Sequence, residues 1–404
     1  MRNNIVNGLG ALLPTVFLDG FAIGFTVPIV PLLLGSLTDQ SQTGTSFGYA
    51  AATLSYALAG FVCSPMIGKL TIRVGYRRML LVALAGAAVD FAVAATAESL
   101  WQLCVAQVIA GVCGTSMVVV SAYVAKATIP ERRAQTFGLI AACFSTGMAL
   151  GPMVGGWLGG FSVRAALWAA ATLCCANFAY VAVVFRDSTA VGIAATAKQS
   201  GILKTLAELH KLSGLLSSFT FLAIAHTATQ TALLLYTQFQ FGWTSVQVGM
   251  FLGANAAAAI VGQLLLPRYA MRIYGELPSL LVALIARTIA FILFSLAVSG
   301  WQMYAALSLA IVGSMGIPLF MATIAARVPE HRQGETQGAL NSLILLATVI
   351  GPAGAASISG LAQGALPRPS ALLACAAVTA IATLCLVWSM RHASVRMALK
   401  TSAV

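Results

Sequence analysis

The chain has 404 residues, of which 59% are apolar and only 8% are charged. Soluble domains carry about a quarter charged residues, so this composition excludes a globule covered by polar surface. In a soluble protein the formal net charge of +12 would suggest nucleic acid as a partner. Here the basic residues lie in short loops between apolar stretches, where they would face anionic membrane lipid, and no nucleic acid partner is expected.

Apolar stretches long enough to cross a hydrocarbon layer of about 30 Å as helices recur along the whole chain. No stretch alternates over about ten residues as the strands of a membrane barrel do. We therefore predict an all-α integral membrane protein with twelve transmembrane helices. In chain order the predicted spans are 8–37, 47–69, 79–97, 102–127, 135–160, 164–185, 216–240, 246–270, 278–299, 301–326, 335–364 and 370–390.

Lys and Arg residues indicate the orientation, because basic residues near span ends stay on the cytoplasmic side. With the N-terminus inside, Arg164 and Arg368 fall outside and Arg287 lies within a span, while the other 19 of the 22 basic residues lie inside. This distribution predicts a multi-pass protein of a bacterial-type cytoplasmic (inner) membrane, with both termini in the cytoplasm.

The sequence also repeats itself at an offset of 200 residues. LLVAL at 80–84 recurs at 280–284, and PERRAQTFG (130–138) parallels PEHRQGETQG (329–338). An ordered series of this length predicts two six-helix halves in parallel repeat. Further matching pairs are Gly75 with Gly275, Phe91 with Phe291, Trp101-Gln102 with Trp301-Gln302, and Gly151-Pro152 with Gly351-Pro352.

This repeat defines the expected domains: a six-helix bundle over 1–185, a cytoplasmic linker over 186–215, a second bundle over 216–390, and a cytoplasmic tail over 391–404. Two parallel halves with a site between them at mid-membrane are typical of transporters that work by rocking. The sequence contains no Ser/His/Asp set, metal-ligand cluster or phosphate-binding loop. We therefore expect a transporter rather than an enzyme, without cofactor or metal.

Three segments carry recognisable motifs: FLDGFAIGFTVPIVPLLL (17–34), GKLTIRVGYRRML (68–80) and GMALGPMVGGWLGG (147–160). Through them the chain resembles the major facilitator superfamily, within it the twelve-helix drug/proton antiporters, and most of all the tetracycline exporters. The resemblance covers essentially the whole chain. It implies proton-coupled efflux, by alternating access, of a small organic compound that is drug-like, an antibiotic or siderophore-like.

The loop at 68–80 resembles the superfamily's signature between its second and third helices. Gly68 and Gly75 would frame a tight cytoplasmic turn. Arg73, Arg77 and Arg78 can bind helix-end carbonyls or lipid phosphate, and their functional interpretation is a latch that holds the halves shut on the inside.

The segment at 147–160 is similar to the antiporters' fifth-helix motif. Pro152 is expected to kink the helix, and glycines at helical spacing leave a groove that a neighbouring helix can approach closely. Close packing alone and a role in directing exchange both remain open. The glycines are Gly147, Gly151, Gly155 and Gly156.

The chain departs from the exporter pattern at four positions. Ile72 occupies the acidic position of the signature loop, Lys126 replaces an acid at the end of helix 4, and Gln107 replaces a basic residue in helix 4. In helix 9 the acid of the exporters is absent and Arg287 is present. These departures support an alternative function, uptake or facilitated transport of an organic anion or siderophore without the usual proton relay.

Asp19, Asp90 and Arg287 lie about ten to twelve residues from a span end, and mid-membrane ionisable groups are functional candidates by default. Asp19 and Asp90 are the candidates for proton coupling, although either could form a fixed pair with Arg287. A guanidinium suits a carboxylate or phosphate partner. If neither Asp pairs with Arg287, the substrate is expected to be anionic or carboxylate-bearing.

The span at 216–240 carries His226 and Gln230 on one face, which would meet water or substrate, although His226 could instead be a core histidine. For the other polar residues, interhelical hydrogen bonding is the alternative. The expected partners are a small-molecule substrate, protons and membrane lipid, and the chain is expected to be a monomer. The predicted substrate-binding residues are Arg287, His226, Gln230, Gln238, Gln107, Asn255 and Asn341.

Overall fold

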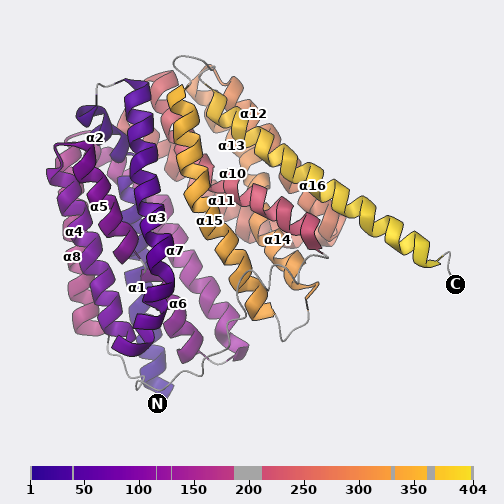
Figure 1. The fold of residues 1–404 in the computed structure, drawn as a ribbon, viewed down its shortest axis with the longest axis horizontal. Coiled ribbons are helices and arrows are strands. Elements are labelled where there is room, and N and C mark those ends of the chain that lie inside the picture. Colours follow the sequence, from indigo (N-terminus) through magenta and orange to yellow (C-terminus); the bar gives the residue numbers. More distant parts are fainter. Residues whose placement is uncertain are drawn as a thin grey trace. The chain divides into compact units, whose positions relative to one another are not determined.

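The computed structural model describes residues 2–38, 41–114, 116–128, 130–185, 212–328, 333–361 and 369–401. These residues are helical almost throughout, and no strand occurs among them (Figure 1). The predicted all-α membrane fold is therefore confirmed. Most of the predicted linker at 186–215 lies outside the described residues.

Each of the twelve predicted spans coincides with one helix or with two consecutive helices. The first six correspond to α1 (Arg2–Thr26), α2 (Val30–Leu37), α3 (Gln42–Val74), α4 (Tyr76–Thr96), α5 (Leu100–Cys113), α6 (Ser116–Ala127), α7 (Pro130–Gly159) and α8 (Val163–Val184). The last six correspond to α10 (Ser213–Phe241), α11 (Ser245–Tyr274), α12 (Glu276–Leu296), α13 (Gly300–Ser314), α14 (Gly316–Ala325), α15 (Gln333–Leu361) and α16 (Ser370–Thr401).

Within the described residues, nine helical stretches are long and apolar enough to cross a membrane. The predicted spans without such a long apolar stretch among the described residues are 47–69, 102–127 and 135–160. For 102–127 the reason is a break in the helix, because α5 ends at Cys113 and is only 14 residues long.

Breaks divide three of the predicted spans into helix pairs. Between α1 and α2 the chain turns at residues 27–29, where Pro28 and Pro31 remove backbone donors and disfavour a continuous helix. Gly114 separates α5 from α6, and Met315 separates α13 from α14. Pro318 then lies in the first turn of α14, where a missing N–H is tolerated.

The internal repeat has a structural explanation at two places. Gly75 and Gly275 join α3 to α4 and α11 to α12 with φ values of 96° and 80°, a region that favours glycine. Gln102 and Gln302 each accept a backbone N–H just before their helix, at 2.6 and 2.7 Å from the nitrogens of residues 98 and 298. The repeated residues therefore specify where helices begin.

The chain forms two compact units. The first unit comprises Met1–Ala195 with Thr237–Ala257, and the second comprises Thr196–Tyr236 with Ala258–Val404. In the first, α1 packs along α7 and α4 along α8, and in the second α12 packs against α13 and α16. Each unit has its own apolar core. Members of the first core include Leu33, Leu34, Phe91, Leu103 and Leu167, and members of the second include Phe219, Leu280, Leu284, Phe320 and Leu386.

Helix α12 shows the side-chain distribution of a membrane helix. One face of the helix exposes large aliphatic side chains, among them Ile285, Ile289 and Leu296, while the opposite face buries the small Ala283 and Ala290 together with Leu280 and Leu284. Small residues let helices approach closely where no hydrophobic effect drives them together, and aliphatic residues suit contact with lipid. The sequence of α12 therefore fits a bilayer.

Candidate functional site

Asp19 lies in the second half of α1 and is partly buried. The hydroxyl of Ser116 donates a hydrogen bond to its Oδ2. Ser116 is the first residue of α6, directly after the break that follows α5, so the interruption of the helix brings this hydroxyl to α1. No ion pair to Asp19 occurs among the described residues.

Asp90 lies on the buried face of α4, and only 5% of it is exposed. Its Oδ1 has no hydrogen-bond partner within the described part of the chain. Both acids predicted for proton coupling lie in the first unit.

Arg287 lies in the middle of α12 and is 6% exposed. Its Nη2 is 2.9 Å from Nδ1 of His226 and donates to the hydroxyl of Thr229 at 3.1 Å. The guanidinium carbon lies 5.4 Å from the centre of the Phe291 ring. The structure thus brings two predicted site residues, Arg287 and His226, into direct contact across α10 and α12.

Thr229 belongs to this cluster, although sequence reasoning did not select it for the site. The available signal was its position three residues after His226, because side chains at that spacing are neighbours on a helix. Its neighbour Thr227 has a different environment and donates to the carbonyl of Ala347 at 2.8 Å, which joins α10 to α15.

The other predicted substrate-binding residues are polar side chains on several helices. Their side chains are partly buried. Their role in binding the substrate stays a prediction. These residues are Gln107, Gln230, Gln238 and Asn255, while the side chain of Asn341 lies outside the description.

In the signature loop, Gly75 forms the turn between α3 and α4, but the prediction that Gly68 also frames it is wrong, because α3 continues through residue 68 to Val74. The guanidinium of Arg77 donates to the carbonyl of Ala182, in the last turn of α8. Arg78 is exposed. One arginine therefore binds a helix-end carbonyl, which is one of the two kinds of partner expected. The side chains of Ile72, Arg73 and Lys126 lie outside the described part of the chain.

The glycines of α7 form two contact surfaces. Gly147, Gly151 and Gly155 face the backbone of α1, and a Cβ on Gly151 would lie 2.6 Å from the carbonyl oxygen of Phe21. Gly156 faces the first turns of α11 within the same unit, and a Cβ added to Gly156 would lie 3.1 Å from the Cα of Gly249. Only glycine permits this approach of three helices.

A family model described as Major Facilitator Superfamily matches residues 12–352. The chain belongs to this superfamily. Its relatives include the tetracycline resistance protein of class G from Vibrio anguillarum, 33% identical over 87% of this chain and 90% of the relative. The class C protein from Escherichia coli is 29% identical over 87% of this chain and 89% of that protein.

The solved structures support the same fold. The crystal structure of the human organic anion transporter MFSD10 (TETRAN) covers 95% of this chain and 99% of its own, with a TM-score of 0.66 and 22% identity. The predicted resemblance to the superfamily and to tetracycline exporters is thus confirmed. The chain is a multi-pass membrane transporter and not an enzyme, since the family consists of transport proteins.

Proposed function

We propose that this transporter exports a small organic compound across the bacterial cytoplasmic membrane in exchange for protons, by alternating access. Asp19 and Asp90 carry the protons, and both termini lie in the cytoplasm. The observation that carries the proposal is the pair of mid-helix carboxyls in the first unit, in a chain whose relatives include tetracycline resistance proteins.

The surroundings of the two carboxyls support this role. An acid that forms a buried ion pair is held in its charged form, because losing the charge would leave the cation uncompensated. Neither Asp19 nor Asp90 is in an ion pair within the described residues. Each can therefore bind and release a proton without breaking a salt bridge, as a coupling site must when its access changes sides.

The test starts with a growth screen of expressing cells against tetracycline, other drugs and carboxylate siderophores, with Asp19→Asn as the control. The compound found is then followed in proteoliposomes with an imposed pH gradient. For exchange of one proton with a neutral compound, a gradient of about one pH unit supports roughly tenfold accumulation. We expect this accumulation to vanish in Asp19→Asn and Asp90→Asn, whereas accumulation that ignores the gradient would overturn the proposal.

The second candidate function is uptake or facilitated passage of an organic anion or siderophore. It is favoured by Arg287, a buried cation in the helix where the exporters carry an acid. The human protein of similar fold is an organic anion transporter, which agrees with this alternative. Anion movement in either direction without a pH gradient, at the same rate in Asp90→Asn, would favour it over proton-coupled export.

A further inference from the structure

The second unit holds a buried positive charge that the described residues of this unit do not neutralise. Arg287 is 6% exposed, and it lies 11 residues after Glu276 at the start of α12. At a rise of 1.5 Å per residue this distance is about 16 Å, so Arg287 is near the middle of the membrane span. A charge at that depth is unfavourable unless a partner compensates it.

The hydrogen bonds of Arg287 go to neutral groups. His226 accepts from Nη2 through Nδ1, which places the proton of the imidazole on Nε2 and leaves the ring uncharged. Thr229 accepts from the same Nη2 through its hydroxyl. These contacts orient the guanidinium and provide no negative charge.

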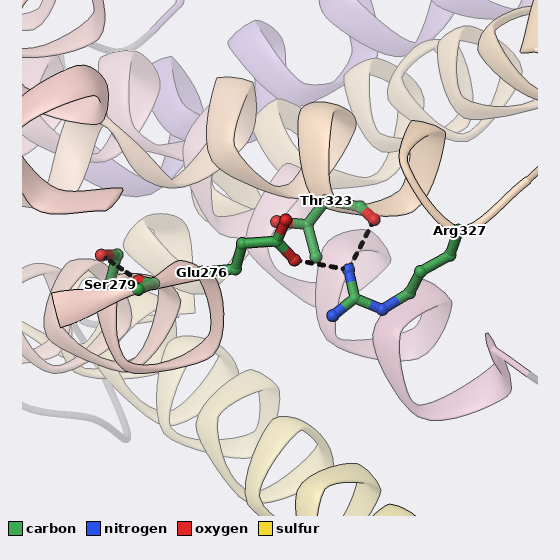
Figure 2. Close-up of polar contacts among 5 residues, drawn as sticks. Glu276, Ser279, Thr323 and Arg327 are labelled. Atoms are coloured by element: carbon green, nitrogen blue, oxygen red, sulfur yellow. Dashed lines mark hydrogen bonds and ion pairs between the residues drawn. The ribbon is translucent and has the colours of Figure 1, made fainter. Parts of the chain in front are cut away.

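The acid nearest in sequence is already used. Among the described side chains of the second unit, Glu276 is the one carboxylate, and it accepts from Arg327 at 2.9 Å. Figure 2 shows this contact, in which Nη1 of Arg327 lies between the Glu276 carboxylate and the carbonyl oxygen of Thr323. Glu276 therefore compensates a surface cation at the end of the helix.

The guanidinium is also held in place and incompletely bonded. A Cβ on Gly313 would lie 2.9 Å from the Cα of Arg287 and 3.0 Å from its Cδ, so α13 packs directly on the side-chain stem. Phe291 lies one turn further along α12, beside the guanidinium. Nε is buried and has no hydrogen-bond partner in the described residues, and Nη1 has none there either.

We propose that Arg287, with His226 and Thr229 as its supports, binds an anionic oxygen group of the transported compound, namely a carboxylate. The unused N–H groups of Nη1 are the donors for it, because Nε is buried and its N–H points to another edge of the guanidinium. Charge-assisted hydrogen bonds of this kind are among the strongest in proteins. This inference rests on the proposed transport function and names its substrate class, a carboxylate-bearing organic compound.

The test measures binding to the purified full-length transporter in detergent. The probes are naphthalene-2-carboxylate and naphthalene-2-carboxamide, which share a shape and differ in charge, and the readouts are calorimetric affinity and the unfolding temperature. We expect the carboxylate to bind and the carboxamide to bind at least about tenfold more weakly. Equal binding of both probes to the unmodified protein would overturn the proposal without any variant.

Variants then assign the carboxylate preference to Arg287. Arg287→Gln should lose it, and Arg287→Lys, which keeps the charge, should recover part of it. Arg272→Gln removes an equal charge from an exposed position of α11 and should bind like the unmodified protein. A carboxylate preference that survives in Arg287→Gln contradicts the proposal. If Arg287→Gln does not fold, the Thr229 variants decide. Loss of the carboxylate preference in Thr229→Val, with an unchanged preference in Thr229→Ser, supports the proposal. A carboxylate preference that persists in Thr229→Val contradicts the proposal.

The same assay separates this inference from the proposed function. Binding needs no pH gradient, so Asp90→Asn should keep the carboxylate preference even though its coupled transport is lost. If the unmodified protein shows no gradient-driven transport but keeps the Arg287-dependent carboxylate preference, this result contradicts proton-coupled export and leaves the anion site standing. If transport responds to the pH gradient but the carboxylate preference does not depend on Arg287, this result contradicts the anion site and leaves proton-coupled export standing.

Discussion

Replacing Gly151 by alanine should disrupt the contact between α7 and α1. The added Cβ would lie 2.6 Å from the carbonyl oxygen of Phe21, 2.6 Å from the nitrogen of Phe25 and 2.7 Å from the carbonyl carbon of Gly24. All three are backbone atoms that cannot rotate away. Ordinary contact begins near 3.4 Å, so the two helices must separate by about 0.8 Å.

Overpacking of this kind costs about 1–3 kcal/mol. In a unit of this size, a loss of about 2 kcal/mol lowers the unfolding temperature by roughly 4–8 °C, which is measurable in detergent by fluorescence. Gly354→Ala in α15 is the matched control, because a Cβ there meets nothing within 4 Å. That control should be neutral or gain up to about 1 kcal/mol from better helix propensity. An unchanged unfolding temperature for Gly151→Ala, or an equal loss for Gly354→Ala, would refute the reasoning.

Three further predictions concern polar contacts. Ser116→Ala removes the hydroxyl that donates to Asp19 and should change the pH profile of transport, whereas Ser116→Thr keeps a hydroxyl. Superimposable pH profiles for the unmodified protein and both variants would contradict the coupling role of Asp19. Arg77→Ala loses a partly buried hydrogen bond to a helix-end carbonyl and should destabilise the protein by about 1–3 kcal/mol, measured by thermal unfolding. Arg78→Ala, at an exposed position, should change the stability by at most about 0.5 kcal/mol. Arg327→Gln breaks an ion pair whose side chains are 30% and 44% exposed and should cost less than about 1 kcal/mol, with a smaller effect at high salt.

Features that depend on local sequence could be predicted. Apolar length located the helices, and the repeat placed equivalent turns at Gly75 and Gly275, because a glycine at positive φ is required at each. The conspicuous Trp-Gln pairs also have a local cause, since Gln102 and Gln302 each cap the start of a helix.

Features that depend on the rotation of one helix against another could not be predicted. The sequence indicated that Arg287 needs a partner, but Asp19, Asp90 and a substrate anion could each have been that partner. The contact with His226 and Thr229 follows from how α10 faces α12, which the periodicity of either helix alone does not specify. Likewise, the hydrogen bond from Ser116 to Asp19 depends on the break after α5, and Gly114 alone does not require a break.

The central claim is that substrate and proton movements are obligatorily linked through Asp19 and Asp90. The most direct measurement loads proteoliposomes with the transported compound, imposes no pH gradient, and follows internal pH with a trapped dye while the compound leaves. Proton-coupled exchange predicts that outflow of the compound through the unmodified protein acidifies the interior, and that Asp90→Asn abolishes this acidification. Outflow of the compound through the unmodified protein at constant internal pH would contradict the account.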